Sequence, residues 1–276
     1  MTYLADKPKA TITLSTLNKY KATGEKFSCL TCYDASFAAS MQAAGVDSIL
    51  VGDSLGMVVQ GQASTLPVTV ADMVYHTENV ARANTHALIM TDLPFMSYAT
   101  LDDAIASSRA VMQAGAHMVK IEGGRNLTQI VSTLADNGVP TCVHLGLTPQ
   151  SVNVFGGYKV QGKTDEAANR LIEDCHAVTA AGAAVLLLEC VPAELAKTIT
   201  QSVDLPVIGI GAGVDTDGQV LVMHDMLGVY TRKPAKFVKD FLTDSKNASR
   251  SIQGAFELYH EEVKQKAFPT PAHSFL

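Results

Sequence analysis

Six polar residues stand at the ends of short apolar runs, and their types suit acid–base chemistry or metal binding. In chain order they are Asp34, Asp53, Asp92, Glu122, His144 and Glu189. An acid after a strand is most often a helix N-cap, and Asp34, which precedes ASFAASMQAA, fits that role. The next three acids are harder to explain as caps. Carboxylates that converge on one site repel each other unless a cation neutralises them or one is protonated, so the pattern indicates a bound divalent metal.

The expected metal site consists of oxygen donors alone, from Asp53, Asp92 and Glu122. Hard oxygen ligands suit Mg²⁺ or a similar divalent ion, whereas zinc sites usually contain Cys or His at short spacing. Two or three carboxylates also leave coordination positions for water and for a chelating substrate. The alternative is that these acids cap helices or pair with arginines.

Lys120 lies two residues before Glu122 in the run MVKIEGG. Side chains two apart in a strand share one face, so both point toward the same interior. A buried lysine needs an anionic partner, and three roles stay open for Lys120. It forms a structural ion pair with a neighbouring acid, it binds a substrate carboxylate or a developing enolate, or it forms a Schiff base.

His144 and Glu189 complete the set of candidate residues. His144 is either a core histidine or a hydrogen-bond donor to the substrate. Glu189 closes the apolar run AAVLLLE, and a carboxylate in apolar surroundings takes up a proton more readily, which suits a general base. The alternative for Glu189 is a structural partnership with Lys120.

Strand-like runs alternate with segments of helical periodicity, which is typical of a parallel sheet. The runs are FSCLTC (27–32), SILVG (48–52), ALIMT (87–91), HMVKI (117–121), TCVHL (141–145), AVLLLE (184–189) and PVIGI (206–210). The expected helices span 36–44, 70–84, 102–114, 127–137, 164–181 and 193–202. Four of them end in Gly followed by a small or apolar residue, the expected left-handed cap before the next strand.

Seven or more strand–helix units without a linker predict one α/β domain over residues 1–276, a closed (β/α)8 TIM barrel of parallel strands. The eighth strand is poorly marked, and GVY (228–230) is the candidate. Charged helical segments at 234–241 and 248–266 predict a C-terminal helical extension. An open doubly wound sheet is the second choice, but no G-x-G-x-x-G follows the first strand.

Composition limits the function classes. Of the 276 residues 47% are hydrophobic and 17% charged, and the net charge is −6, so nucleic acid is not an expected partner. No apolar stretch is long and uninterrupted enough for a membrane span. The N-terminal segment resembles no targeting signal, so we expect a cytoplasmic protein. The five scattered cysteines are expected to be reduced, buried thiols, although Cys29 and Cys32 form a C-x-x-C.

Two long loops and one glycine-rich turn lie near the expected barrel mouth. Segments 56–70 and 147–163 contain glycine and are candidate lids. The turn GIGAG (209–213) offers backbone N–H groups to an anion or a close approach to a flat ring, or else it only joins a strand to a helix.

Seven segments together resemble one enzyme family. They are YDASFA (33–38), VGDSLGMV (51–58), TDLPFMSY (91–98), VKIEGG (119–124), HLGLTPQ (144–150), LECVP (188–192) and GIGAG with DGQVLVMHDMLG (209–228). The chain resembles the ketopantoate hydroxymethyltransferases, also called 3-methyl-2-oxobutanoate hydroxymethyltransferases. The resemblance implies a (β/α)8 barrel that transfers a hydroxymethyl group from 5,10-methylenetetrahydrofolate to 3-methyl-2-oxobutanoate through a Mg-stabilised enolate. The product is 2-dehydropantoate, used in pantothenate and coenzyme A biosynthesis.

The resemblance also implies roles for individual residues. The 2-oxo acid would be held by Ser54, Asp53, Asp92, Lys120 and His144. Asp53 and Asp92 would bind Mg²⁺ directly, Glu122 would complete the metal site, and Glu189 would be the catalytic base. The partners would be the 2-oxo acid and folate, whose contacts leave no recognisable motif, and the family's assemblies imply a homo-oligomer such as a decamer.

Two other functions stay open. A Mg-dependent 2-oxo acid lyase of the phosphoenolpyruvate mutase and isocitrate lyase type would use a similar barrel, but its usual cysteine-bearing loop is not evident. A barrel kept as a binding or regulatory subunit would have lost site residues, and all of the expected ones are present.

Overall fold

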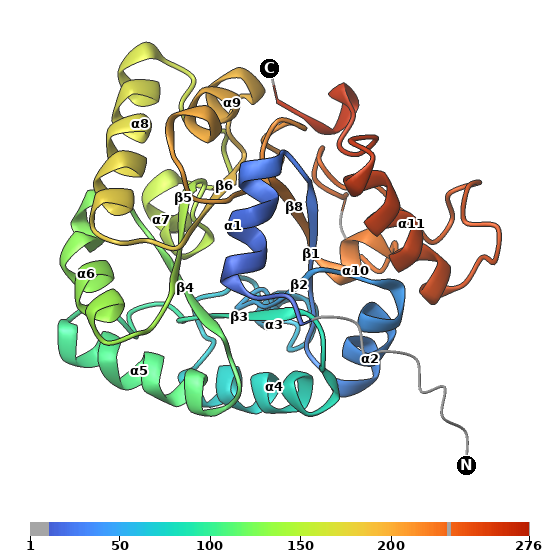
Figure 1. Cartoon of the computed structure of the whole chain (residues 1–276), viewed down its shortest axis with the longest axis horizontal. Coiled ribbons are helices and arrows are strands. Elements are labelled where there is room, and N and C mark those ends of the chain that lie inside the picture. The colour runs from blue at the N-terminus through green and yellow to red at the C-terminus, as the bar shows by residue number, and fades with distance from the viewer. Residues whose placement is uncertain (1–10, 231–232, 276) are drawn as a thin grey trace.

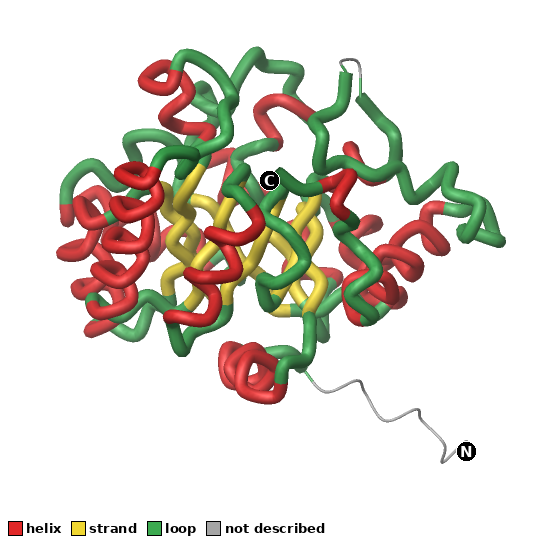
Figure 2. The backbone as a smooth tube through the Cα atoms, turned by 90° about the horizontal axis from the view of Figure 1, so that it is seen from above, coloured by secondary structure: helices red, strands yellow, loops and turns green. Residues whose placement is uncertain are grey.

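The computed structural model describes residues 11–230 and 233–275, and its centre is a closed parallel barrel. The strands pair in chain order and the last pairs with the first, so the alternative of an open sheet is wrong. Helices surround the strands (Figures 1 and 2). The strands are β1 (Phe27–Thr31), β2 (Ser48–Val51), β3 (Leu88–Asp92), β4 (Met118–Glu122), β5 (Thr141–Gly146), β6 (Val185–Glu189), β7 (Val207–Ile210) and β8 (Gly218–Leu221).

Each strand and helix expected from the apolar runs and the helical periodicity before residue 211 is confirmed to within one residue at either end. The strands are buried along nearly their whole length, as in a parallel sheet covered by helices. The helices are α1 (Leu14–Thr23), α2 (Ala35–Ala44), α3 (Leu55–Val58), α4 (Val70–Ala83), α5 (Leu101–Gln113), α6 (Thr128–Asp136), α7 (Val152–Phe155), α8 (Asp165–Ala180), α9 (Ala193–Ser202), α10 (Met223–Met226) and α11 (Ile252–Lys264). Three 3₁₀ turns are η1 (Arg125–Leu127), η2 (Pro149–Ser151) and η3 (Pro271–His273).

The caps of α2 follow the sequence signals. The Asp34 carboxylate accepts a hydrogen bond from the Phe37 N–H at 3.0 Å, which confirms it as the N-cap. Gly45 ends the helix with φ of 88°, a left-handed conformation that a residue with a Cβ adopts at a cost. These caps fix where the chain leaves β1 and where it enters β2.

The eighth strand is not at 228–230, as expected, but at Gly218–Leu221. The pattern of apolar runs missed this strand because its first two residues, Gly218 and Gln219, do not carry apolar side chains. Gly218 leaves room for the ring of Phe27, which a Cβ would meet at 2.4 Å, and Gln219 donates to the Gly213 carbonyl inside the barrel. Val229 and Tyr230 are exposed and follow α10. The strand is therefore specified by tight packing rather than by hydrophobicity.

The C-terminal extension is confirmed in one of its two helices. Helix α11 packs on α2 and β1, and the hydroxyl of Tyr259 donates to the carbonyls of Cys29 and Gln219. Residues 234–241 are not helical, because the backbone there bonds elsewhere: the N–H of Phe241 donates to the carbonyl of Met226 at 2.8 Å. The extension thus fastens β1 to β8 and supports barrel closure.

Three further expectations concern the whole chain. All five cysteines are buried and unbridged, and burial raises the pKa of the Cys29 thiol to about 12, which disfavours redox chemistry. No helix in the described ranges is both long and apolar enough to cross a bilayer. All eight strands belong to one barrel, which supports our proposal of one domain over 1–276. Residues 1–10, on which the expected lack of a targeting signal partly rests, lie outside the described ranges.

Candidate active site

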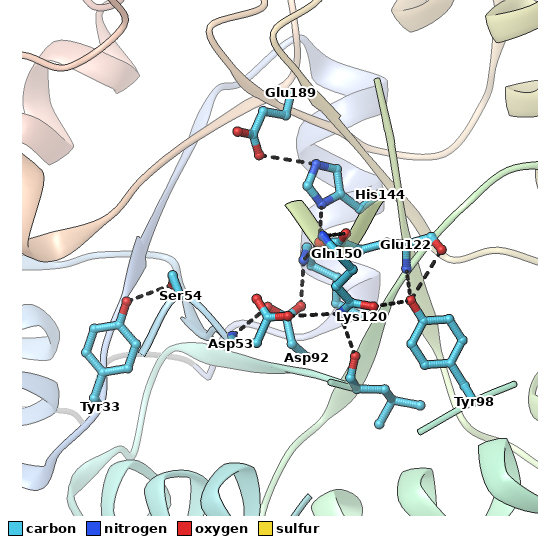
Figure 3. Close-up of polar contacts among 11 residues, drawn as sticks. Tyr33, Asp53, Ser54, Asp92, Tyr98, Lys120, Glu122, His144, Gln150 and Glu189 are labelled. Atoms are coloured by element: carbon cyan, nitrogen blue, oxygen red, sulfur yellow. Dashed lines mark hydrogen bonds and ion pairs between the residues drawn. The ribbon is translucent and has the colours of Figure 1, made fainter. Parts of the chain in front are cut away.

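Neighbouring strands bring the predicted charged residues together at the carboxyl end of the barrel (Figure 3). In the sheet register Asp92 lies beside Lys120, Glu122 beside His144, and Gly146 beside Glu189. Asp53 and Ser54 follow β2, two and three residues after its last residue. Barrel enzymes place their catalytic groups at this end. The arrangement follows from the parallel strands, because Asp92, Glu122 and Glu189 are each the last residue of a strand.

Lys120 is held between carboxylates. Its Nζ lies 2.6 Å from Asp92 Oδ1 and 3.7 Å from Glu122 Oε1, and all three side chains are under 5% exposed. Burial alone would lower the pKa of Lys120, but the carboxylates of Asp92 and Glu122 outweigh it and raise that pKa. The side chain is therefore an ammonium ion, which disfavours a Schiff base because that reaction needs the neutral amine.

His144 bridges two carboxylates from the strands on either side. Its Nδ1 lies 3.2 Å from Glu122 Oε1, and its Nε2 lies 3.3 Å from Glu189 Oε2. Burial and Lys120 lower the pKa of His144, but Glu122 and Glu189 raise it overall to about 9. These separations are those of ion pairs, although the angles are not those of aligned hydrogen bonds. His144 is thus an imidazolium at neutral pH, and Glu189 pairs with it rather than with Lys120.

Asp53 is the acid whose charge is least compensated. Its N–H donates to Asp92 Oδ2 at 2.9 Å, and the Gln150 side chain donates to its Oδ2 at 2.9 Å. Burial, followed by the nearby charges of Asp92 and Glu122, raises the pKa of Asp53 well above its usual range. In the described part of the chain Asp53 and Asp92 neither cap a helix nor pair with an arginine, which argues against that alternative for these two acids.

The residues fit a divalent cation in part. Asp53 and Asp92 are buried carboxyl groups close enough for the charge of Asp92 to raise the pKa of Asp53, and carboxylate oxygens are the donors that Mg²⁺ prefers. The contacts of Glu122 are with Lys120, His144 and the backbone N–H of Gln150. Across 11–230 and 233–275, no three His, Cys, Asp or Glu side chains are gathered as ligands of one ion. The metal site stays a prediction, and Asp53 and Asp92 are the pair that fits it.

Gln150 and Tyr98 are site residues that the sequence reasoning missed. Besides its contact with Asp53, Gln150 donates from its side chain to the Leu93 carbonyl at 2.9 Å and from its backbone to Glu122 Oε2 at 2.9 Å. The Tyr98 hydroxyl donates to Gln150 Oε1 at 2.5 Å. Gln150 is uncharged and lies outside the strand and helix patterns, so neither charge nor periodicity marks it. The one sequence signal for it was its position in the segment HLGLTPQ. Gln150 connects the loop after β5 to the carboxylates.

Ser54, Tyr33 and Asp225 border the site on its other side. The Ser54 hydroxyl lies 2.9 Å from that of Tyr33, whose ring is buried. Asp225, in α10, was also missed; burial and the charge of Glu189 raise its pKa to about 6. The signal for Asp225 was the segment VMHDMLG, in which its role could not be read.

The glycine turn and the loops are only partly as expected. The C-terminal tail covers the GIGAG turn, because a Cβ at Gly211, whose φ is 60°, would meet Phe237 at 2.9 Å and Phe275 at 3.1 Å. Close packing therefore accounts for this glycine. The two candidate lids touch each other, with the Tyr158 hydroxyl 3.6 Å from Met57 Sδ. A role in closing the site stays a prediction.

Buried acids, an ammonium and an imidazolium at the carboxyl ends of barrel strands define the chain as a (β/α)8-barrel enzyme. A family model described as ketopantoate hydroxymethyltransferase matches residues 11–271. A 3-methyl-2-oxobutanoate hydroxymethyltransferase of Psychrobacter sp. (strain PRwf-1) is 66% identical over 268 residues, 96% of this chain and 99% of the relative. One of the same name from Acinetobacter baumannii (strain AYE) is 60% identical over 265 residues, covering 96% and 98%. The chain belongs to the ketopantoate hydroxymethyltransferase family.

Solved structures share the fold at much lower identity. A phosphoenolpyruvate phosphomutase from Streptomyces platensis subsp. rosaceus aligns with a TM-score of 0.59 and 14% identity, over 78% of this chain and 83% of that one. A phosphonomutase-like protein from Burkholderia cenocepacia J2315 aligns with a TM-score of 0.64 and 15% identity, over 78% and 95%. At such identities the likeness concerns the barrel alone, so it does not favour the lyase alternative over the transferase.

Proposed function

We propose that this protein transfers a hydroxymethyl group from 5,10-methylenetetrahydrofolate to 3-methyl-2-oxobutanoate and forms 2-dehydropantoate. Membership of the family supports the reaction. The observation that carries the residue roles is the chain of contacts from Lys120 through Glu122 and His144 to Glu189, which joins a fixed cation to an accessible carboxylate. Enolisation of a 2-oxo acid needs a cation to bind the substrate carboxylate and a base to remove the C3 proton.

Glu189 is the base in this proposal. Its side chain is 14% exposed, against 2% for Glu122 and 3% for Asp92, so it is the most open of these three carboxylates. The imidazolium of His144 contacts one oxygen of Glu189 and holds that carboxylate in place. Removal of the C3 proton by Glu189 gives an enolate, whose C3 forms a bond to the one-carbon unit of the folate. The two bonds from that carbon to folate nitrogens break, water supplies the hydroxyl, and tetrahydrofolate leaves with one proton from C3 and one from water.

The remaining residues bind and orient the 2-oxo acid. The Lys120 ammonium attracts its carboxylate, His144 and the Ser54 hydroxyl offer hydrogen bonds, and Asp53 and Asp92 would hold the Mg²⁺, with Glu122 completing its surroundings. A divalent cation there would polarise the keto oxygen and make the C3 proton more acidic. Gln150 fixes the orientation of Asp53 through its side-chain amide.

A product assay tests this function. Enzyme, Mg²⁺, 3-methyl-2-oxobutanoate and 5,10-methylenetetrahydrofolate should give 2-dehydropantoate, detected by NMR, and omission of the folate should abolish the product. A lyase would instead cleave a carbon–carbon bond of its substrate without folate. We also propose a cytoplasmic homo-oligomer, with a decamer as the form to be tested by light scattering, and neither nucleic acid nor membrane as a partner.

A further inference from the structure

A second cavity, of about 430 Å³, opens beside the active site. Its walls come from the loop after β1 and from the helices α2, α3, α4 and α10. The volume lies within the range of small-molecule sites. The proposed binding of the 2-oxo acid uses none of the groups that line it, so the cavity has room for a second ligand.

Flat rings form much of the wall. The rings of Tyr33 and His224 have centroids 5.6 Å apart, and Tyr75 and His76 meet edge to face at 5.3 Å. Tyr75 is 63% exposed and Val59 is 48% exposed, so apolar surface is left open to solvent at the rim. Aromatic walls of this kind suit a planar ring, which stacks on faces and contacts edges.

Two hydrogen-bond acceptors are fixed in the cavity. The Nδ1 of His76 lies 2.7 Å from the Tyr33 carbonyl oxygen, which only accepts, so Nδ1 carries the proton and a neutral ring has its lone pair on Nε2. Asp34 uses Oδ1 to cap α2, and its carboxylate retains further acceptor sites. A ligand that carries several N–H donors matches these acceptors.

The cavity is one side chain away from the candidate active site. Tyr33 lines the cavity, and its hydroxyl lies 2.9 Å from Ser54 Oγ, next to Asp53 in the chain. A ring bound in the cavity would therefore hold a substituent near the 2-oxo acid.

We propose that this cavity binds the pterin ring of the folate co-substrate, an inference that rests on the proposed function. The ring N3–H and the 2-amino group of a pterin form an edge of adjacent donors, which a carboxylate such as Asp34 accepts together. The bicyclic ring lies against Tyr75 and His224. The one-carbon unit, carried at the junction with the folate side chain, then faces Tyr33 and the 2-oxo acid.

Three variants test the assignment without disturbing the local fold. Asp34→Asn keeps the helix cap, because Asn caps as well as Asp. His76→Asn keeps a donor for the Tyr33 carbonyl and removes Nε2, and Tyr75→Ala removes an exposed ring. Each variant should weaken tetrahydrofolate binding measured by calorimetry and raise the KM for 5,10-methylenetetrahydrofolate. For Asp34→Asn both changes should be about 10- to 100-fold. Folate-independent exchange of the substrate C3 proton should stay at the wild-type rate.

The matched controls lie in a smaller cavity of about 210 Å³ on the opposite side of the site, where Phe95→Ala and Asn126→Ala should leave tetrahydrofolate binding unchanged. Wild-type binding by the Asp34 and Tyr75 variants, or loss of binding in the controls instead, would overturn the proposal. The proposal would also be overturned if the cavity variants lost proton exchange together with tetrahydrofolate binding. If the wild type exchanges no proton but the cavity variants still lose tetrahydrofolate, the proposed function fails and the pterin site stands.

Discussion

The Nε2 atom of His144 lies 3.3 Å from Oε2 of Glu189, and its Nδ1 faces Glu122 from the other side. The pKa of His144, raised to about 9 by these two carboxylates, means that the ring is charged under physiological conditions. A carboxylate that contacts a charged ring is held in one orientation. In the proposed mechanism, this contact lets the buried His144 position the carboxylate of Glu189, the proposed base.

His144→Gln should lower kcat/KM for the 2-oxo acid by about 100-fold, because an amide fills the space and bonds to one carboxylate but carries no charge. Steady-state kinetics at pH 7.5 measures the effect. His176→Gln, at an exposed position beside Ser202, is the control and should behave as wild type. Equal activity in the two variants would contradict a role for the imidazolium charge.

Lys120→Met should destabilise the protein at neutral pH by about 3–5 kcal/mol, because Asp92 and Glu122 lose their buried cation. Urea unfolding checks this, and stability should partly recover in mild acid as the carboxylates take up protons. Lys197→Met, whose partner is 4.0 Å away on the surface, should change stability little. In the wild type, borohydride with the 2-oxo acid should trap no adduct at Lys120, and a stable adduct would restore the Schiff-base alternative.

Gln150→Ala should raise the Mg²⁺ concentration needed for half-maximal activity several-fold and lower stability by about 1–3 kcal/mol. The reason is that Asp53 and Tyr98 lose their shared partner, so the Asp53 carboxylate is no longer oriented. Mn²⁺ binding followed by electron paramagnetic resonance gives a readout independent of turnover. Gln161→Ala, in the same loop and bonded only locally through its side chain, is the control. Unchanged Mn²⁺ affinity in Gln150→Ala would rule out this orienting role.

Asp225→Asn should stabilise the protein at pH 7 by on the order of 1–3 kcal/mol. Burial raises the folded-state pKa of Asp225 to about 6, above the unfolded value near 4. The folded state thus binds the proton more tightly, so this group's contribution to stability is complete below pH 4 and is lost as the pH rises through 6. Urea unfolding at pH 4 and pH 7 should show a gain at pH 7 alone, whereas the surface control Asp215→Asn should show none.

The sequence predicted the strands before residue 211 because their apolar runs are continuous, and it predicted the acids at their ends because parallel strands end on one side. It missed β8, where Gly218 and Gln219 are specified by a ring and a buried amide contact. It missed Gln150 because the position of this side chain is set by contacts with residues distant in the sequence, such as Asp53 and Leu93. The pairing of His144 with Glu189 depends on the register of β5 and β6, which one sequence does not show.

The most direct test of the mechanism is exchange of the C3 proton of 3-methyl-2-oxobutanoate in D₂O, followed by NMR without folate. A metal-assisted enolisation with Glu189 as base predicts exchange by the wild type with Mg²⁺, none with EDTA, and a rate lower by about 100- to 10,000-fold in Glu189→Gln. Glu194→Gln, exposed at the start of α9, should exchange normally. Exchange that persists in EDTA would contradict the metal assignment, and exchange at the wild-type rate in Glu189→Gln would contradict its role as the base.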